Sequence, residues 1–138
     1  MVPPLVSTLA ETLAALVGRE PLQLTPKLEL GLRIMTENPW EVGADLVANA
    51  VAAYERFGRA CIVVDFGTAL SFTAVAAPGE LRGVAIAPGL TAAVESLARS
   101  TAQLPSVYLA PPPVAIGRNT VHSIQAGVVF GYTGLVGE

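Results

Sequence analysis

The sequence predicts an α/β protein with a mixed sheet and flanking helices. Segments with apolar residues at helical spacing alternate with extended apolar segments, and three of the extended segments follow one another across short turns. From residue 38 onward the predicted order is helix, three strands, helix, strand, helix. Strands joined by tight turns form an antiparallel meander, whereas a strand reached through a helix can pair in parallel. The sheet is therefore expected to be mixed.

Two helices are predicted in the first half of the chain. Residues 5–17 carry Leu and Val at helical spacing, and Gly18 is a typical helix stop. Residues 19–38 are interrupted by prolines and glycine, which indicates a short strand and loops. A second helix is expected over residues 38–57, because its asparagine can cap, the next proline suits the first helical position and a glutamate can reach back. Its end is predicted at Gly58, and its apolar stripe consists of Val47, Ala50, Val51 and Tyr54.

The strand meander is predicted in the middle of the chain. Residues 60–64 form a continuous apolar run, as in a central strand with both faces covered. Residues 71–77 and 81–87 flank Pro78-Gly79, a turn signal. These three segments are expected to pair in sequence order.

Two further helices are predicted in the last third. One is expected over residues 91–103 and the other over residues 119–136, where Asn119 can act as the cap. The prolines between them indicate a rigid, exposed connection. Gly127 and Gly131 lie four residues apart, which favours close packing of the last helix against a neighbour.

The composition restricts the class of protein. Apolar residues make up 52% of the chain and charged residues only 14%, so apolar surface is expected to be exposed, as in an excerpt of a larger fold or a subunit with a large interface. The net charge is −3 and basic residues are scattered, which argues against nucleic acid and anionic membranes as partners. The single cysteine, Cys61, and the lack of a targeting signal or membrane span predict a cytoplasmic protein.

Asp65-Phe66-Gly67-Thr68 is the most informative local motif. A carboxylate at the end of a buried strand needs a cation, a hydrogen-bond partner or solvent, because an unpaired buried charge is costly. The glycine and threonine that follow offer backbone N–H groups and a hydroxyl, which suit a phosphate. An ordinary turn remains the alternative.

Two helix starts carry further candidates. Gly43-Ala44-Asp45 places a carboxylate in a first helical turn, where the helix dipole favours it; in a cleft it can also act as a general base. Gly117-Arg118-Asn119-Thr120 leads into a cap that can bind a polar ligand. His122 is the only histidine, so a zinc cluster is not expected. A hydrolase using Ser71 and His122 lacks a nucleophile elbow.

In order and spacing, these motifs resemble the type III pantothenate kinases, a family that includes members once named Bvg accessory factors. Residues 36–138 follow the family pattern with essentially no gaps. The matching segments are Glu37-Asn38-Pro39, Glu41 to Asp45, Asn49-Ala50, Val63 to Ala69, Ala87-Pro88-Gly89, Leu104-Pro105, Gly117 to Thr120, Gln125 to Gly127 and Gly131-Tyr132.

The resemblance implies a lobe of the actin-like ATPase (ribonuclease H-like) superfamily, with residues 1–57 ending an N-terminal lobe and residues 58–138 beginning a C-terminal lobe. It implies ATP-dependent phosphorylation of pantothenate by a homodimer, with Mg²⁺ and a monovalent cation, K⁺ or NH₄⁺. Its implied site residues are Asp45 as general base, Gly43, Ala44, Leu46 and Thr120 at pantothenate, Gly67 and Thr68 at ATP, and Asp65 at the cation.

The chain also departs from the family pattern. Leu46 stands where the family has arginine, Thr36 where an aromatic residue is usual, Leu70-Ser71 replaces Thr-Thr, and Gly83-Val84 replaces a glycine pair. Neither the family's first phosphate motif nor its adenosine motif occurs, so the chain is expected to be an internal segment that is inactive alone. A non-catalytic homologue with an interaction or regulatory role is the alternative.

Overall fold

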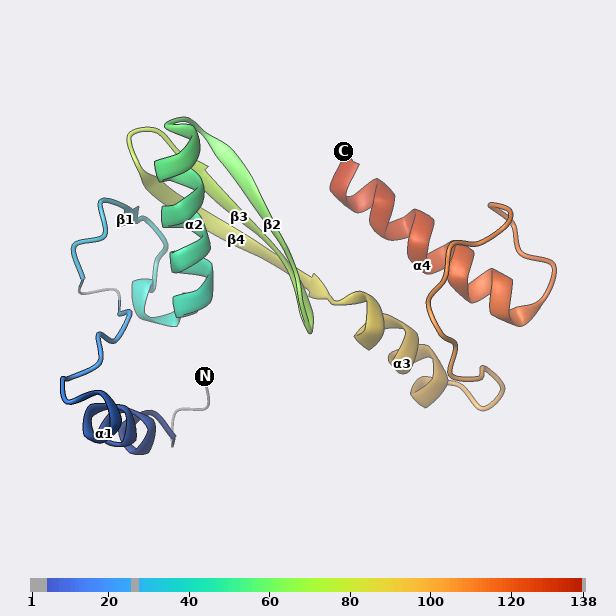
Figure 1. Cartoon of the computed structure of the whole chain (residues 1–138). Helices are drawn as coiled ribbons and strands as arrows, with labels where there is room; N and C mark the ends of the chain where they lie inside the picture. The colour runs from blue at the N-terminus through green and yellow to red at the C-terminus, as the bar shows by residue number, and fades with distance from the viewer. Residues whose placement is uncertain (1–4, 26–27, 138) are drawn as a thin grey trace.

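The computed structural model describes residues 5–25 and 28–137. Its helices and strands alternate largely as the sequence predicts (Figure 1). They are α1 (Val6–Val17), β1 (Arg33–Ile34), the 3₁₀ helix η2 (Pro39–Glu41), α2 (Ala44–Phe57), β2 (Cys61–Phe66), β3 (Ala69–Ala76), β4 (Glu80–Pro88), α3 (Leu90–Ser100) and α4 (Thr120–Gly137).

The four strands form one mixed sheet in the order β1-β4-β3-β2. The β2–β3 and β3–β4 pairs are antiparallel, whereas β1 pairs with β4 in parallel. Ala74 pairs with Gly83 and Val75 with Leu81, so Arg82 is an extra residue in β4 without a partner on β3. Such a bulge changes which way the following side chains point. The predicted mixed sheet and the meander are confirmed.

Two separate apolar clusters hold the elements together. In the first, Val47 and Ala50 of α2 pack against Val75 and Leu81 of the sheet. The second joins α3, α4 and the connection between them, and its buried members are Val94, Val107, Ile124 and Val128. Figure 1 shows α2 lying along one face of the sheet, with α3 and α4 set apart beyond the end of β4.

The predicted helix and turn boundaries depend on local signals that the structure confirms. Gly18 and Gly58 end α1 and α2 in the left-handed conformation, with φ of 73° and 59°. Gly79, in the β3–β4 turn, has φ of 81°. Each of these positions favours glycine because a Cβ atom is disfavoured there. Asn119 caps α4, since its Oδ1 accepts a hydrogen bond from the His122 N–H at 2.8 Å.

The single helix expected over residues 38–57 is wrong, because the structure has two helices there. Val42 adopts an extended conformation (φ −72°, ψ 123°) between η2 and α2, and Gly43 is the residue that precedes α2. The Asn38 side chain caps no backbone N–H. It donates instead from Nδ2 to Glu41 Oε1 at 2.9 Å, so the two side chains of the expected capping box pair with each other.

The predicted central position of the strand at residues 60–64 is also wrong for the described residues. β2 is an edge strand of the sheet, and Ile62 on its outer face is 60% exposed. The strand also runs through Phe66, so Asp65 lies within it and does not follow it.

Two expectations about the last third of the chain fail. The part of the chain described between α3 and α4 contains no strand, although one was expected there. This segment is held to α4 by a side chain, because the Gln125 amide donates to the Tyr108 carbonyl at 2.9 Å. Gly127 and Gly131 face open space, since a Cβ atom built on either would meet nothing within 4 Å. They therefore do not mediate close packing within the chain.

The expected exposure of apolar surface is observed. α1 has no buried residue, although it presents leucines along its length. On α4, Phe130 and Leu135 are also largely exposed. None of the helices in the described ranges is long and apolar enough to cross a membrane.

Candidate functional site

The N-terminal half of α2 and the strand β2 bring the two predicted carboxylates to the same side of the sheet. Cys61 and Val63 pack against the α2 cluster, and Asp65, two residues further on, points to that same face because side chains alternate along a strand. Asn49 of α2 donates from Nδ2 to Asp65 Oδ2 at 3.0 Å. Asp45 precedes Asn49 by four residues, which makes the two neighbours on the helix surface at about 5–6 Å between Cβ atoms. Asn49 thus contacts Asp65, whereas Asp45, one helical turn before Asn49, is exposed.

The sheet surface beneath this pair of carboxylates is polar. Ser71 of β3 lies directly opposite Asp65, and Thr73 lies opposite Val63, so both hydroxyls occupy the face that α2 covers. Both residues are buried, Thr73 with 1% of its surface exposed. Hydroxyl groups in such a position add oxygen donors and acceptors next to Asp65.

The turn between β2 and β3 contains the predicted phosphate residues, Gly67 and Thr68. The Gly67 N–H donates to the Ala69 carbonyl at 3.0 Å, so this N–H is occupied within the turn. The Thr68 carbonyl accepts from the Gly89 N–H at 3.0 Å. A Cβ atom on Gly89 would collide with the Gly67 carbonyl and lie 2.6 Å from the Thr68 carbonyl oxygen. Gly89 therefore allows the start of α3 to pack directly on this turn.

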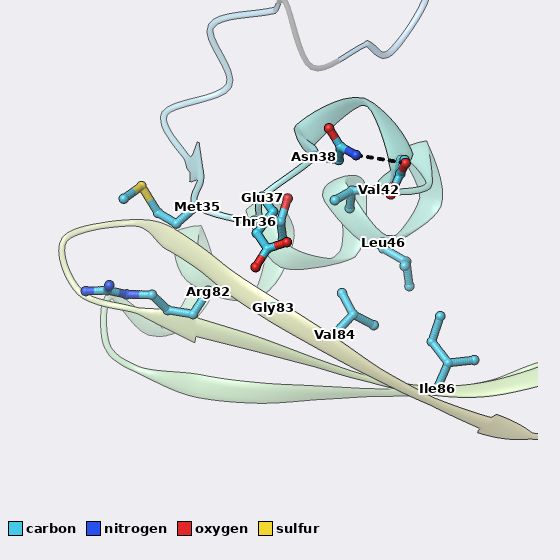
Figure 2. A pocket seen from close by; sticks show the side chains of 11 residues that line it. Met35, Thr36, Glu37, Asn38, Val42, Leu46, Arg82, Gly83, Val84 and Ile86 are labelled. Atoms are coloured by element: carbon cyan, nitrogen blue, oxygen red, sulfur yellow. Dashed lines mark hydrogen bonds between the residues drawn. The ribbon is translucent and has the colours of Figure 1, made fainter.

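A pocket of about 570 Å³ runs along β4 beneath η2 and the start of α2 (Figure 2). Leu46, Val84 and Ile86 form its apolar end, and Arg82 lies toward the opposite end. The other residues that line it are Met35, Thr36, Glu37, Asn38, Glu41, Val42 and Gly83. The Thr36 hydroxyl oxygen is buried and has no hydrogen-bond partner among the described residues. The pocket thus combines an apolar wall, one arginine, two glutamates and an unsatisfied hydroxyl.

Arg82 is held in place by a buried carboxylate. Glu80 is 6% exposed and pairs with Arg33 of β1 and with Arg82, whose Nη2 lies 2.6 Å from Glu80 Oε2. A carboxylate can be buried when hydrogen-bonded cations compensate for its lost solvation. Two arginines on one glutamate give this group of three side chains one net positive charge, next to Glu37 and Glu41 of the pocket lining.

The structure brings together some of the predicted site residues and separates others. Leu46 lines the pocket, whereas Gly43, Ala44 and Asp45, at the start of α2, and Asp65 are not part of its lining. Thr120 begins α4, which packs against α3 and lies on the far side of the molecule from α2 (Figure 1). Within one chain, Thr120 is not close to Asp45.

Asp65 has one carboxylate oxygen free to bind a ligand. No group of three or more His, Cys, Asp or Glu side chains gathers anywhere in residues 5–25 or 28–137. Asp65 is half-buried, and over the same residues no hydrogen bond reaches its Oδ1. A carboxylate oxygen and the Ser71 hydroxyl opposite it are hard oxygen donors of the kind that bind hard cations.

Comparison with known proteins identifies the family. The family model described as type III pantothenate kinase matches residues 1–138. The chain belongs to the type III pantothenate kinase family. The type III pantothenate kinase of Anaeromyxobacter sp. (strain K) is 51% identical over 136 residues, which cover 99% of this chain and 54% of that protein. For the Myxococcus xanthus protein, the identity is 47%, with 99% and 53% covered. The chain spans about half the length of the curated relatives it matches.

A solved structure supports the fold of this type III pantothenate kinase family member. It is described as a Baf family transcriptional activator from Campylobacter jejuni and matches with a TM-score of 0.59 over 94% of this chain and 58% of that chain. Sequence identity is 18%, so the similarity concerns the fold alone.

Sequence reasoning missed three features that shape this kinase-family site. The Asn49–Asp65 hydrogen bond depends on how α2 docks on β2, which no local pattern specifies. The bulge at Arg82 depends on strand register. The sequence partly indicated the contact of Gly89 with the β2–β3 turn, because a glycine after proline at a strand end is a signal for close backbone approach.

Proposed function

We propose that this protein transfers the γ-phosphoryl group of ATP to pantothenate, giving 4′-phosphopantothenate in the first step of coenzyme A biosynthesis. Family membership supports the reaction class. The observation that supports the proposal is that Asn49, one helical turn after Asp45 in α2, donates a hydrogen bond to Asp65. Phosphoryl transfer to an alcohol uses a base that accepts the hydroxyl proton and cations that neutralise the phosphate charge, and the two carboxylates suit these two roles.

In this proposal Asp45 accepts the proton of the primary hydroxyl of pantothenate. The alcohol oxygen then forms a bond to the γ-phosphorus, the bond from that phosphorus to the bridging oxygen breaks, and ADP leaves. Gly43 and Ala44 give the substrate access to Asp45, and Leu46 contacts its apolar part in the pocket. A monovalent cation at Asp65 and Mg²⁺ on the nucleotide would supply positive charge next to the phosphates.

The nucleotide end of the cleft is assigned to the β2–β3 turn. We place the ATP phosphates at the turn of Gly67 and Thr68, where the Gly67 N–H is bonded within the turn and the Thr68 hydroxyl has no partner among the described residues. The proposal includes an actin-like ATPase fold with lobes meeting near residues 57 and 58, a cytoplasmic location, and a homodimer. The separation of Thr120 from Asp45 within one chain supports the dimer, because a second copy can bring Thr120 to the pocket.

The test is a coupled assay of ATP turnover with pantothenate on the full-length gene product. Asp45→Asn is expected to lower kcat by about 10²- to 10⁴-fold, as removal of a general base does. Glu55→Gln removes an exposed carboxylate from the far end of the same helix and should leave kcat unchanged. No pantothenate-dependent turnover by the wild-type protein, or equal kcat in both variants, would refute the assignment.

One observation favours a non-catalytic alternative, an interaction or regulatory module. Leu46 gives the pocket an apolar wall where the family pattern has an arginine, and leucine cannot replace the forked contacts of a guanidinium. Isothermal titration with pantothenate separates the two hypotheses. If the wild-type protein does not bind and Leu46→Arg restores binding while Leu46→Ala does not, one residue explains the loss; no restoration supports the non-catalytic hypothesis.

A further inference from the structure

Asn49 makes the one hydrogen bond that connects α2 to Asp65 in the described structure. Its Nδ2 lies 3.0 Å from Asp65 Oδ2, in a partly buried contact. Both ends of the contact are fixed, because Ala50, next to Asn49, is fully buried and Val63, two residues before Asp65, packs on the same cluster. The amide therefore has little freedom to move away from the carboxylate.

The direction of this hydrogen bond is determined by chemistry. An ionised carboxylate only accepts hydrogen bonds, whereas an asparagine amide has both a donor and an acceptor end. With the amide turned over, its oxygen would face Asp65 Oδ2 and repel it. The donor end must face Asp65, and Oδ2 is committed to Asn49.

The hydrogen bond from Asn49 to Oδ2 fixes the orientation of the Asp65 carboxylate. When one oxygen is held by a rigid donor, the second has a fixed direction, and Asp65 Oδ1 accepts no hydrogen bond from the described residues. Ser71 lies across the strand pair from Asp65, and Asp45 lies one helical turn before Asn49. The free oxygen thus remains available on the face of the sheet that also carries Ser71.

We propose that Asn49 is a positioning residue: by holding Asp65 Oδ2, it presents Asp65 Oδ1 to the monovalent cation. This inference rests on the proposed function, and in particular on the cation role of Asp65. Groups that orient a metal ligand through a hydrogen bond typically change metal affinity by about 10- to 100-fold when removed. Asn49 should therefore act on cation affinity more than on folding.

The experiment measures the melting temperature of the full-length protein during titration with KCl, against tetramethylammonium chloride at the same ionic strength. The wild-type protein is expected to show a K⁺-specific rise, because a ligand that binds only the native state stabilises it. Asn49→Ala should move the midpoint of this rise to about tenfold higher K⁺. Asn49→Ser, which keeps a shorter donor, should fall between the two and serves if the alanine variant does not fold.

Gln125 provides the matched control. Its side-chain amide is also a buried donor, but it bonds to the Tyr108 carbonyl in the other cluster. Gln125→Ala should lower the melting temperature equally in both salts and leave the K⁺ midpoint unchanged. Asn49→Asp places a second carboxylate next to Asp65. In tetramethylammonium chloride this variant should have a lower melting temperature than the wild-type protein, and K⁺ should raise its melting temperature by more.

The outcomes separate this inference from the proposed function. The positioning role is overturned if Asn49→Ala and Asn49→Ser have the same K⁺ midpoint as the wild-type protein. It is also overturned if Gln125→Ala shifts the K⁺ midpoint as much as Asn49→Ala does. If the wild-type protein shows no K⁺-specific rise, the cation role of Asp65 and this inference both fail. Pantothenate-dependent ATP turnover in the same preparation then shows whether the proposed function stands without them.

Discussion

Gly89→Ala tests how closely the start of α3 must approach the phosphate turn. Gly89 has φ of −67° and ψ of 162°, a conformation that alanine adopts readily, so the substitution creates no backbone strain of its own. Its added Cβ atom would instead collide with the Gly67 carbonyl and lie 2.6 Å from the Thr68 carbonyl oxygen. These are backbone atoms, so the turn has to move.

The expected cost follows from two contributions. Overpacking against a fixed neighbour costs about 1–3 kcal/mol. The displaced turn also weakens the hydrogen bond from the Gly89 N–H to the Thr68 carbonyl, which contributes about 1 kcal/mol. The sum is about 2–4 kcal/mol of unfolding free energy, or a fall in Tm of roughly 8–16 °C for a chain of this length. ATP affinity should fall as well, because Thr68 moves.

Urea denaturation and isothermal titration with ATP measure the two effects. Gly83→Ala is the control, since its Cβ atom would meet nothing within 4 Å and it lies in the adjoining strand. That variant should be neutral or stabilised by about 0.5 kcal/mol. If Gly89→Ala is as stable as Gly83→Ala and binds ATP equally well, the steric reasoning is wrong.

Two further predictions concern a helix cap and a buried charge. Asn119→Ala should cost about 1 kcal/mol in thermal unfolding because it removes the α4 cap, whereas Asn38→Ala should cost little because Asn38 caps no backbone N–H; equal losses would contradict the assignment of the caps. Replacing Arg33 and Arg82 together by Met should cost about 3 kcal/mol in urea denaturation, more than Glu80→Met, because it leaves a buried carboxylate unpaired. A larger loss of unfolding free energy for Glu80→Met than for the double arginine variant would show that Glu80 stabilises the fold mainly through packing.

The sequence alone was sufficient for features that depend on local chemistry. Gly18 and Gly58 end helices because only glycine enters the left-handed region without cost, and Asn119 caps because its side chain reaches a nearby N–H. The meander followed from Pro78-Gly79 between two apolar runs. Asp45 and Asp65 were singled out as candidates by their place at the start of a helix and near the end of a strand, and the family was found by the order of its motifs.

Tertiary structure alone decided the features that depend on pairing between distant segments. Nothing local to residues 60–64 distinguishes an edge strand from a central one, because an apolar run has the same periodicity in either place. The extra residue at Arg82 exists only relative to the register of β3, and the Asn49–Asp65 contact only relative to the docking of α2 on β2. Short-range preferences determine where elements begin and end, whereas the packing of two surfaces determines which side chains meet. For that reason the two carboxylates could be named from the sequence, but the amide that joins them could not.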